Sequence, residues 1–335
     1  MEAETAWAAA AANTKAVLGG IGLAHLPNLL LFVGAFLLLA LVGWAVWHRR
    51  EEPGGFLRFL FPGRVWRHPS TRDDAVLTAI NLIVSPLSAG LAVAAGGWLA
   101  HLTSVAVSGA TGWNPSFAWD VWSIAGLTLA LALVSDLATY IVHRLHHTVP
   151  WLWEFHKVHH SAEVLSPLTI FRKHPVFDLC SRMLKALLVG PLMGLVFALF
   201  AGPVGIWTAM GTNAVYAAFQ LGGAGLRHSH VWLSYGRVLE HVLISPAQHQ
   251  IHHSREPRHW DRNFGQMFAL WDWMFGSLYV PRGRERFRLG LDDAPSRDFG
   301  GVRGGLLRPF ARAWAVFRAG RVRKGPAGRR GRAAA

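Results

Sequence analysis

The sequence predicts an all-α integral membrane protein with four to five transmembrane helices and a cytoplasmic helical cap that carries a histidine-rich dimetal site. Three observations lead to this prediction. Of 335 residues, 52% are hydrophobic and 16% are charged, whereas about a quarter of the residues in soluble domains are charged. Long stretches carry no charge, and twelve of the 18 histidines fall within residues 143–160 and 228–253. This composition excludes a disordered chain and disfavours a soluble enzyme.

The spans are predicted from the uncharged stretches, taken in chain order. Residues 16–47 and 75–119 carry no charge, and residues 121–142 carry only Asp136. Residues 186–226 are also uncharged. A spanning helix needs about 20 apolar residues, so this last stretch is interpreted as two helices that turn at Gly202-Pro203. The opening MEAETAW lacks a basic segment, so we expect no cleaved signal peptide.

Arginines predict the sides of the membrane. Six arginines lie between residues 48 and 74, whereas the loop SGATGWNPSFAWD after the second stretch has no Lys or Arg. Because cytoplasmic loops are enriched in Lys and Arg, we expect the first loop in the cytoplasm. The polar regions 143–185 and 227–335 then face the cytoplasm as well.

Three copies of one histidine pattern lie beside the predicted spans: HRLHH at 143–147, HKVHH at 156–160 and HQIHH at 249–253. Residues at i, i+3 and i+4 lie on one helix face, so each triplet can direct two or three imidazoles to one point. Pro150 can end one helix and begin another, which brings the first two triplets together. Imidazole binds zinc, copper, iron and nickel, and eight or more imidazoles are too many for one ion. We therefore predict a two-metal centre.

Other metal chemistries fit the sequence less well. One cysteine excludes a disulfide framework, a zinc ribbon and an iron–sulfur cluster. Ferritin-like centres need Glu-x-x-His pairs, haem uses only one or two histidines, and the HExxH motif of zinc proteases is absent. A membrane metal transporter or sensor stays as an alternative, although its ligands are expected near the bilayer midplane.

The ordered motifs resemble the membrane-bound fatty acid hydroxylase/sterol desaturase superfamily, the histidine-box di-iron oxygenases. DLATYIVHRLHHTVPWLWEFHKVHHSAE resembles the first two boxes, and LRHSHVWLSYGRVLEHVLISPAQHQIHHS the last boxes. DRNFGQMFALWDWMFGSLYVP resembles the closing segment, and FRKHP at 171–175 a recurring stretch. The resemblance implies a catalytic domain over 121–281, between an N-terminal membrane region (1–120) and a basic tail (282–335).

The resemblance also implies which residues bind the metals. The first box has the form HxxxH, which leaves His146 at a non-ligand position. His174 and His230 are further candidate ligands. The alternatives for His174 are a hydrogen-bonding role on the substrate side or a structural role before Pro175, and the alternative for His230 is a change to a water site. Asp136, two turns before His143, is expected to accept a hydrogen bond from a ligating histidine, as carboxylates near metal sites commonly do. Asp261 and Asp272 are weaker candidates for that role. The nine expected ligands are His143, His147, His156, His159, His160, His228, His249, His252 and His253.

For the reaction, the resemblance implies two iron ions and O₂ acting on an unactivated C–H bond, by hydroxylation or desaturation. The triplets lie next to apolar spans, so the expected substrate is a lipid from the bilayer, such as a fatty acyl chain, a sterol or an isoprenoid. Electrons are expected from an external ferredoxin or cytochrome b5 type of carrier, drawn to the basic face. A catalytically inactive relative is a further alternative. No residue identifies the substrate or the oligomeric state.

The tail has a separate pattern. Residues 301–335 contain ten Lys and Arg and no Asp or Glu. Leu306, Leu307, Phe310, Trp314 and Phe317 recur at helical spacing, with Pro309 tolerated only in the first turn. We expect an amphipathic helix on anionic lipid, followed by a disordered basic end, and no nucleic-acid binding.

Overall fold

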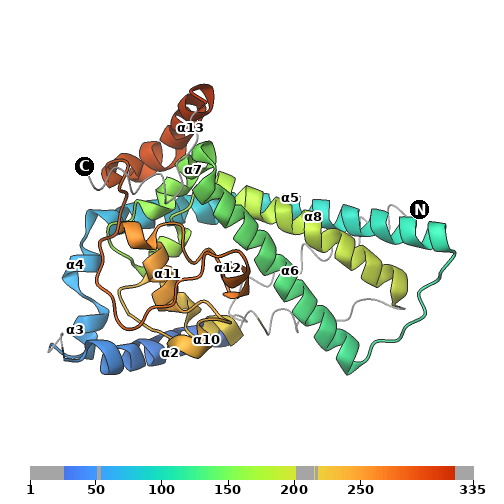
Figure 1. Ribbon diagram of the computed structural model, residues 1–335, viewed down its shortest axis with the longest axis horizontal. Helices are drawn as coiled ribbons and strands as arrows, with labels where there is room; N and C mark the ends of the chain where they lie inside the picture. The colour runs from blue at the N-terminus through green and yellow to red at the C-terminus, as the bar shows by residue number, and fades with distance from the viewer. Residues whose placement is uncertain (1–25, 51–53, 201–214, 216–217, 321–335) are drawn as a thin grey trace.

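The computed structural model describes residues 26–50, 54–200, 215 and 218–320. Within these ranges the chain is helical, and the only extended pairings are two isolated bridges, Phe117 with Phe200 and Leu243 with Phe268. The predicted all-α class is confirmed. Figure 1 shows long helices that extend to one side and a compact group of short helices at the other.

Four of the described helices are long and apolar enough to cross a membrane. The second helix expected within residues 186–226 falls largely on residues outside the described ranges. The long helices are α2 (Leu26–Gly43) with its π-helical continuation η2 (Trp44–His48), α5 (Pro69–Thr111), α6 (Val121–Thr148) and α8 (Pro175–Leu199). Helices α2, α5 and α8 run broadly along the longest axis of the molecule, and α6 crosses it diagonally (Figure 1).

Two of these helices begin earlier than their uncharged stretches. Helix α5 begins at Pro69 rather than at residue 75, and α8 begins at Pro175 rather than at residue 186. The extra turns carry charged residues that are paired: Asp74 with Arg172 at 3.0 Å, and Asp178 with Lys173 at 3.1 Å. An uncharged stretch therefore marks the apolar part of a spanning helix, while its polar end continues into the rest of the fold.

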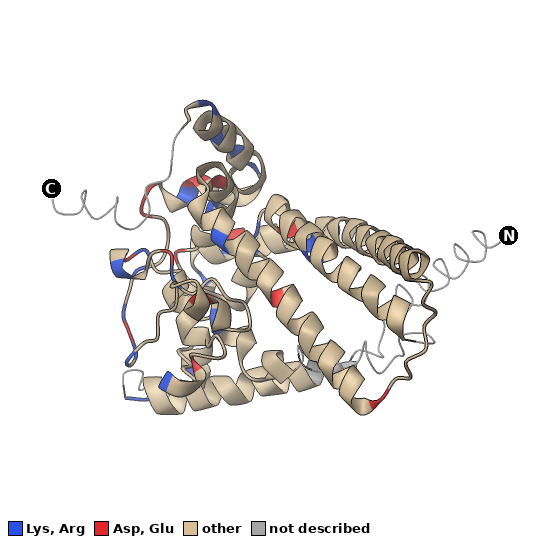
Figure 2. Cartoon of the chain, turned by 45° about the vertical axis from the view of Figure 1, so that its right-hand side comes forward, with Lys and Arg blue, Asp and Glu red and all other residues tan. Residues whose placement is uncertain are grey.

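Helices α5 and α8 lie side by side in both views (Figures 1 and 2). Small residues line their contact. A Cβ added to Gly190 would lie 2.8 Å from the carbonyl oxygen of Gly96, and one added to Gly194 would overlap Ala100 and Thr103. Close backbone approach through small residues is the usual way in which helices associate in lipid.

The short helices form a second region, which we call the cap. Figure 2 shows that Lys and Arg gather in the cap and at the neighbouring ends of the long helices. Its elements, in chain order, are α3 (Phe56–Leu60), α4 (Gly63–Trp66), α7 (Pro150–His160), η3 (Pro167–Phe171), η4 (Ala224–His228), α10 (Gly236–Leu239), α11 (Pro246–His252), η5 (Pro257–His259), α12 (Leu270–Met274), η6 (Ser296–Phe299), η7 (Arg303–Leu307) and α13 (Arg308–Arg318).

The cap packs directly on the polar ends of the long helices. Ala40 of α2 shares an apolar core with Phe59 and Leu226 of the cap. Leu77 of α5 shares another with Val158 of α7. Because these cores bridge the two regions, the spans and the cap form one folded unit.

Candidate metal centre

The three histidine triplets lie on helices that meet at the base of the cap. Helix α6 ends at Thr148, and α7 begins two residues later at Pro150, which occupies the first helical turn as predicted. Helix α11 begins at Pro246, where Ser245 and Gln248 form a reciprocal capping box. These tight turns bring the triplet of α6 beside that of α7 and place α11 across both.

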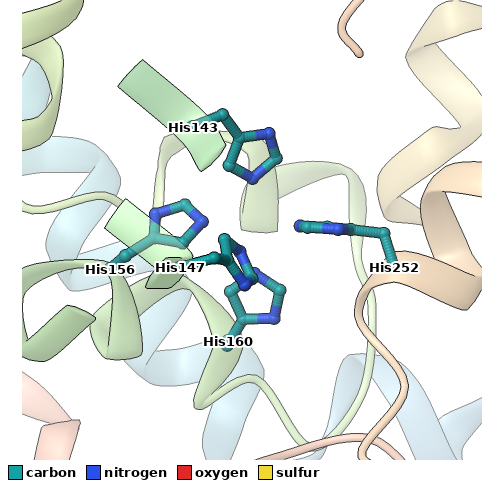
Figure 3. Close-up of side chains that lie close together, drawn as sticks. All are labelled: His143, His147, His156, His160 and His252. Atoms are coloured by element: carbon teal, nitrogen blue, oxygen red, sulfur yellow. The ribbon is translucent and has the colours of Figure 1, made fainter. Parts of the chain in front are cut away.

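Nine histidines form two groups in which the candidate ligand atoms all lie within 4.8 Å of one another. All nine side chains are buried. Figure 3 shows the rings of the first group converging from α6, α7 and α11 on a shared space. Group one contains His143, His147, His156, His160 and His252; group two contains His159, His228, His249 and His253. These are the nine residues named from the resemblance.

The imidazole nitrogens of group one are suited to a metal ion. The Nε2 atoms of His143, His156, His160 and His252 are buried and have no hydrogen-bond partner within the described residues. Buried polar atoms are nearly always paired, so each unpaired one needs an explanation. Four such atoms directed at one point fit a cation bound by their lone pairs.

Group two has the spacing of ligands around a single ion. The Nε2 atom of His228 lies 3.1 Å from that of His159 and 2.9 Å from that of His249. The Nε2 atoms of His253 and His249 lie 3.2 Å apart. Two imidazole nitrogens bound at right angles to an ion at about 2.0–2.1 Å would be about 2.9 Å apart. The donor set therefore fits a second ion.

Backbone carbonyls fix the orientation of three rings. Nδ1–H of His143 donates to the carbonyl oxygen of Phe264 at 2.7 Å, and that of His252 to Arg262 at 2.8 Å. His159 donates to Arg172 at 3.1 Å. A proton held on Nδ1 leaves the lone pair of Nε2 directed into the group, which is the tautomer that metal binding needs.

Burial also sets the protonation state of these histidines. It lowers the pKa of His252 to about 3, and a neighbouring imidazole adds to the effect. The same causes hold the pKa well below its ordinary value in the other ligand candidates of the cap, namely His156, His159, His160, His228, His249 and His253. These imidazoles are therefore neutral at physiological pH, in their metal-binding form.

His146, His174 and His230 lie outside both groups. The Nδ1–H of His146 donates to the carbonyl oxygen of Val142 at 2.8 Å, in agreement with its non-ligand position in the HxxxH box. The proposal of His174 as a ligand is wrong, because it caps α8: its Nδ1 accepts from the amide of Val176, and its Nε2–H donates to the carbonyl oxygen of Leu306. His230 donates instead to the carbonyl oxygen of Phe59 at 2.7 Å.

The prediction that Asp136 orients a ligating histidine is also wrong. Its carboxylate accepts from the backbone amides of Met267 and Phe268 and from the indole of Trp271, at 2.9–3.1 Å. Helical spacing places Asp136 on the same face of α6 as His143. The segment after α11 folds over that face, and its donors take up the hydrogen-bonding capacity of the Asp136 carboxylate. Asp136 thus holds the segment that carries the carbonyl partner of His143.

Asp272 and Asp261, the weaker candidates for orienting a ligating histidine, lie in different parts of the site. Asp272 accepts from the amides of Phe264 and Gly265 at 2.8 and 2.7 Å, and so fixes the turn whose carbonyl orients His143. Asp261 is nearer to a ligand, with its Oδ1 atom 3.8 Å from Nδ1 of His147. Asp261 also has a positive φ of 56°, which Asp tolerates better than most residues.

Arg172, the second residue of FRKHP, supports the site in a way that the sequence does not predict. Arg172 is 1% exposed, and its guanidinium donates to Asp74 at 3.0 Å, to the hydroxyl of Ser161 at 2.7 Å and to the carbonyl oxygen of Val158 at 2.9 Å. Its own carbonyl orients His159. A single buried side chain therefore ties α5 and the end of α7 to group two.

Aromatic side chains enclose group one. Phe177, in the first turn of α8, stacks on His156 with ring centroids 4.7 Å apart. Phe264 contacts His143 and His147. A cavity of about 30 Å³, lined in part by His147 and Asp261, is large enough for a water molecule. The centre is thus apolar toward the spans and has a small polar recess at Asp261.

Comparison with known proteins matches the chain to the fatty acid hydroxylase family over residues 128–277. It is 26% identical to the ornithine lipid hydroxylase OlsE of Rhizobium tropici over 196 residues, which are 58% of this chain and 53% of that protein. It is 28% identical to the alkylglycerol monooxygenase of Danio rerio over 163 residues, 48% of this chain and 31% of that protein.

A further relative is the human cholesterol 25-hydroxylase, with 32% identity over 157 residues, 44% of this chain and 48% of that protein. The chain spans about half, or less, of the length of these relatives. No solved structure matches it significantly. The matched region contains both histidine groups.

Proposed function

We propose that this chain, whose residues 128–277 match the fatty acid hydroxylase family, is a membrane-bound di-iron oxygenase that hydroxylates or desaturates a lipid. The two buried groups of histidines carry the proposal, because their nitrogen atoms converge within 4.8 Å in each group. The relatives include an ornithine lipid hydroxylase, an alkylglycerol monooxygenase and a cholesterol 25-hydroxylase, which supports oxidation of a lipid.

Group one would hold one iron ion and group two the other. Once bound, and supplied with O₂ and two electrons, such a pair supplies the oxidising power to break an unactivated C–H bond. In hydroxylation one oxygen atom enters the product, and the other leaves as water with two protons. Phe177, Phe264 and the buried histidines keep bulk water away from this point.

The substrate is expected to arrive from the side of the spans. Phe177 of α8 touches group one, where it stacks on His156 and meets the ring of His143 edge to face. A lipid chain in the bilayer therefore reaches the centre through an apolar contact. Phe177→Ala should change the position or yield of oxidation while the metal content is retained, and loss of metal in this variant would contradict the assignment.

We place the cap and the tail in the cytoplasm, where the six arginines of residues 48–74 put them by the positive-inside rule. Arg64, Arg284 and Arg286 line a cavity beside His230, together with Glu163 and Glu285. The arginines outnumber the glutamates, which suits an acidic electron carrier of the ferredoxin or cytochrome b5 type. The rate of reduction by such a carrier should fall with rising ionic strength, and a rate insensitive to salt would count against this docking.

A comparison of lipids tests the function. Cells that express the wild-type chain under isotopically labelled O₂ should contain lipids with one labelled oxygen atom, or lipids that have lost two hydrogens. Cells that express His252→Ala or His249→Ala should contain neither, and cells with His241→Ala, an exposed histidine outside both groups, should match the wild type. An unchanged lipid profile in a chain that carries two iron ions would instead identify an inactive family member.

A further inference from the structure

Helix α13 presents bulky apolar side chains that the described part of the chain leaves uncovered. The exposed fraction is 61% for Trp314 and 63% for Phe317, and it is 64% for Leu307, the last residue of η7, which directly precedes α13. Their spacing of seven and then three residues places them on one side of the helix. Single exposed apolar residues are common, but a contiguous row of large ones marks an interaction site.

The opposite side of α13 is fixed to α7. Pro309 and Ala313 are buried, and Nε of Arg312 donates to the carboxylate of Glu154 at 2.7 Å. Phe310 lies at the edge of the apolar row, where it is 52% exposed and its ring meets that of Phe155 edge to face at 5.1 Å. Because packing and a charge-assisted hydrogen bond hold this side, the apolar row cannot turn inward. Figure 1 shows α13 extending from α7 away from the rest of the molecule.

Arginines flank the apolar row. Arg318 is exposed on the neighbouring strip of the helix, together with the small residues Ala311 and Ala315. Arg308 is exposed on the same strip and forms an ion pair with Asp298 at 2.9 Å. Residues 301–335 contain ten Lys and Arg and no acidic residue. A second copy of this chain on the same face would bring like charges together, which is unfavourable. A Trp and a Phe bordered by arginines instead suit the boundary between acyl chains and anionic headgroups.

The location of α13 agrees with that occupant. It packs on α7, which directly follows the polar end of the spanning helix α6, so the bilayer surface is close by. We propose that α13 lies in the headgroup region of the leaflet next to the cap and binds anionic lipid there. The helix that carries His156, His159 and His160 is thereby attached to the membrane surface. This inference does not depend on the proposed reaction.

Site-specific fluorescence tests the proposal, because Cys180 is the only cysteine. In a Cys180→Ser background, Trp314→Cys places a label on the apolar row, and Ala315→Cys places one on the arginine strip as a matched control. The full-length labelled protein is reconstituted in phosphatidylcholine vesicles with and without phosphatidylglycerol. Quenching is then measured with a lipid-borne nitroxide and with aqueous iodide. Phe317→Cys gives a second reading of the apolar row.

With phosphatidylglycerol, the lipid-borne quencher should act on position 314 at least about threefold more strongly than on position 315, and iodide should show the reverse order. Without phosphatidylglycerol, or at high salt, this difference should shrink. Equal exposure of both positions to iodide would overturn membrane binding. Protection of position 314 that disappears on dilution to one chain per vesicle would assign the face to a second copy. Equal protection in both lipids would overturn the anionic preference.

Discussion

The two histidine groups share helices α7 and α11 but are supported by different parts of the fold. Group one takes two of its five histidines from the spanning helix α6, and carbonyls of residues 262–264 orient two of its rings. Group two takes none from a span. One of its rings is oriented by the carbonyl of Arg172, and Gln250 holds the segment that carries His228 through the carbonyls of Ser229 and Val231.

This difference shows that two adjacent metal sites can depend on separate backbone supports. Group one is supported by carboxylates that bind backbone amides, Asp136 and Asp272, while group two is supported by a buried guanidinium. Changes to either support should therefore affect one group more than the other.

The largest effect is expected from Arg172→Ala. Removing the guanidinium leaves Asp74 buried and uncompensated, which typically costs about 3–5 kcal/mol of unfolding free energy. The variant should unfold at a markedly lower temperature in detergent and lose metal from group two before group one. Arg318→Ala removes an exposed arginine and should leave both properties unchanged. A stable Arg172→Ala protein with full metal content would show that this support is dispensable.

Asp272→Ala should weaken group one selectively. The amides of Phe264 and Gly265 and the hydroxyl of Ser277 lose their acceptor, at a cost of about 2–3 kcal/mol when buried donors stay unpaired. The carbonyl partner of His143 then loses its fixed position. Metal titration should show weaker binding of one ion and unchanged binding of the other. Equal weakening of both ions would contradict separate supports.

Gly194→Ala tests whether the packing between α5 and α8 can be disturbed without loss of metal from either histidine group. The added methyl would overlap Ala100 and Thr103 of α5, and such overpacking costs about 1–2 kcal/mol. We expect lower thermal stability with both metal ions retained. Gly97→Ala is the matched control, since a Cβ there meets no atom within 4 Å. Loss of metal in Gly194→Ala alone would show that span packing shapes the centre.

Hydropathy predicted the spanning helices because an apolar stretch of sufficient length has few alternatives in a bilayer. It missed the polar starts of α5 and α8, where tertiary partners such as Arg172 make charges acceptable. The i, i+4 pair of each triplet lies in one group, as regular helices require, whereas the i+3 histidine lies in the other group or, for His146, in neither. The amphipathic helix of the tail is confirmed, with Pro309 in its first turn.

Non-local contacts account for the errors at single residues. Asp136 was assigned by its helical face, but the segment 264–271, distant in sequence, supplies its partners. For His174 the structural alternative holds, because Pro175 begins α8 and the His174 side chain caps that helix. Arg172 has no periodic or motif signal that distinguishes a buried guanidinium from an exposed one. Such roles depend on which segments meet in three dimensions.

The metal content of the purified chain tests the central claim most directly. The wild type should bind about two iron ions per chain. A double variant of group one, His156→Ala with His252→Ala, and one of group two, His228→Ala with His249→Ala, should each retain about one. His146→Ala, in the same sequence triplet but outside both groups, should retain both. A single ion in the wild type, or equal loss from His146→Ala, would contradict the two-group centre.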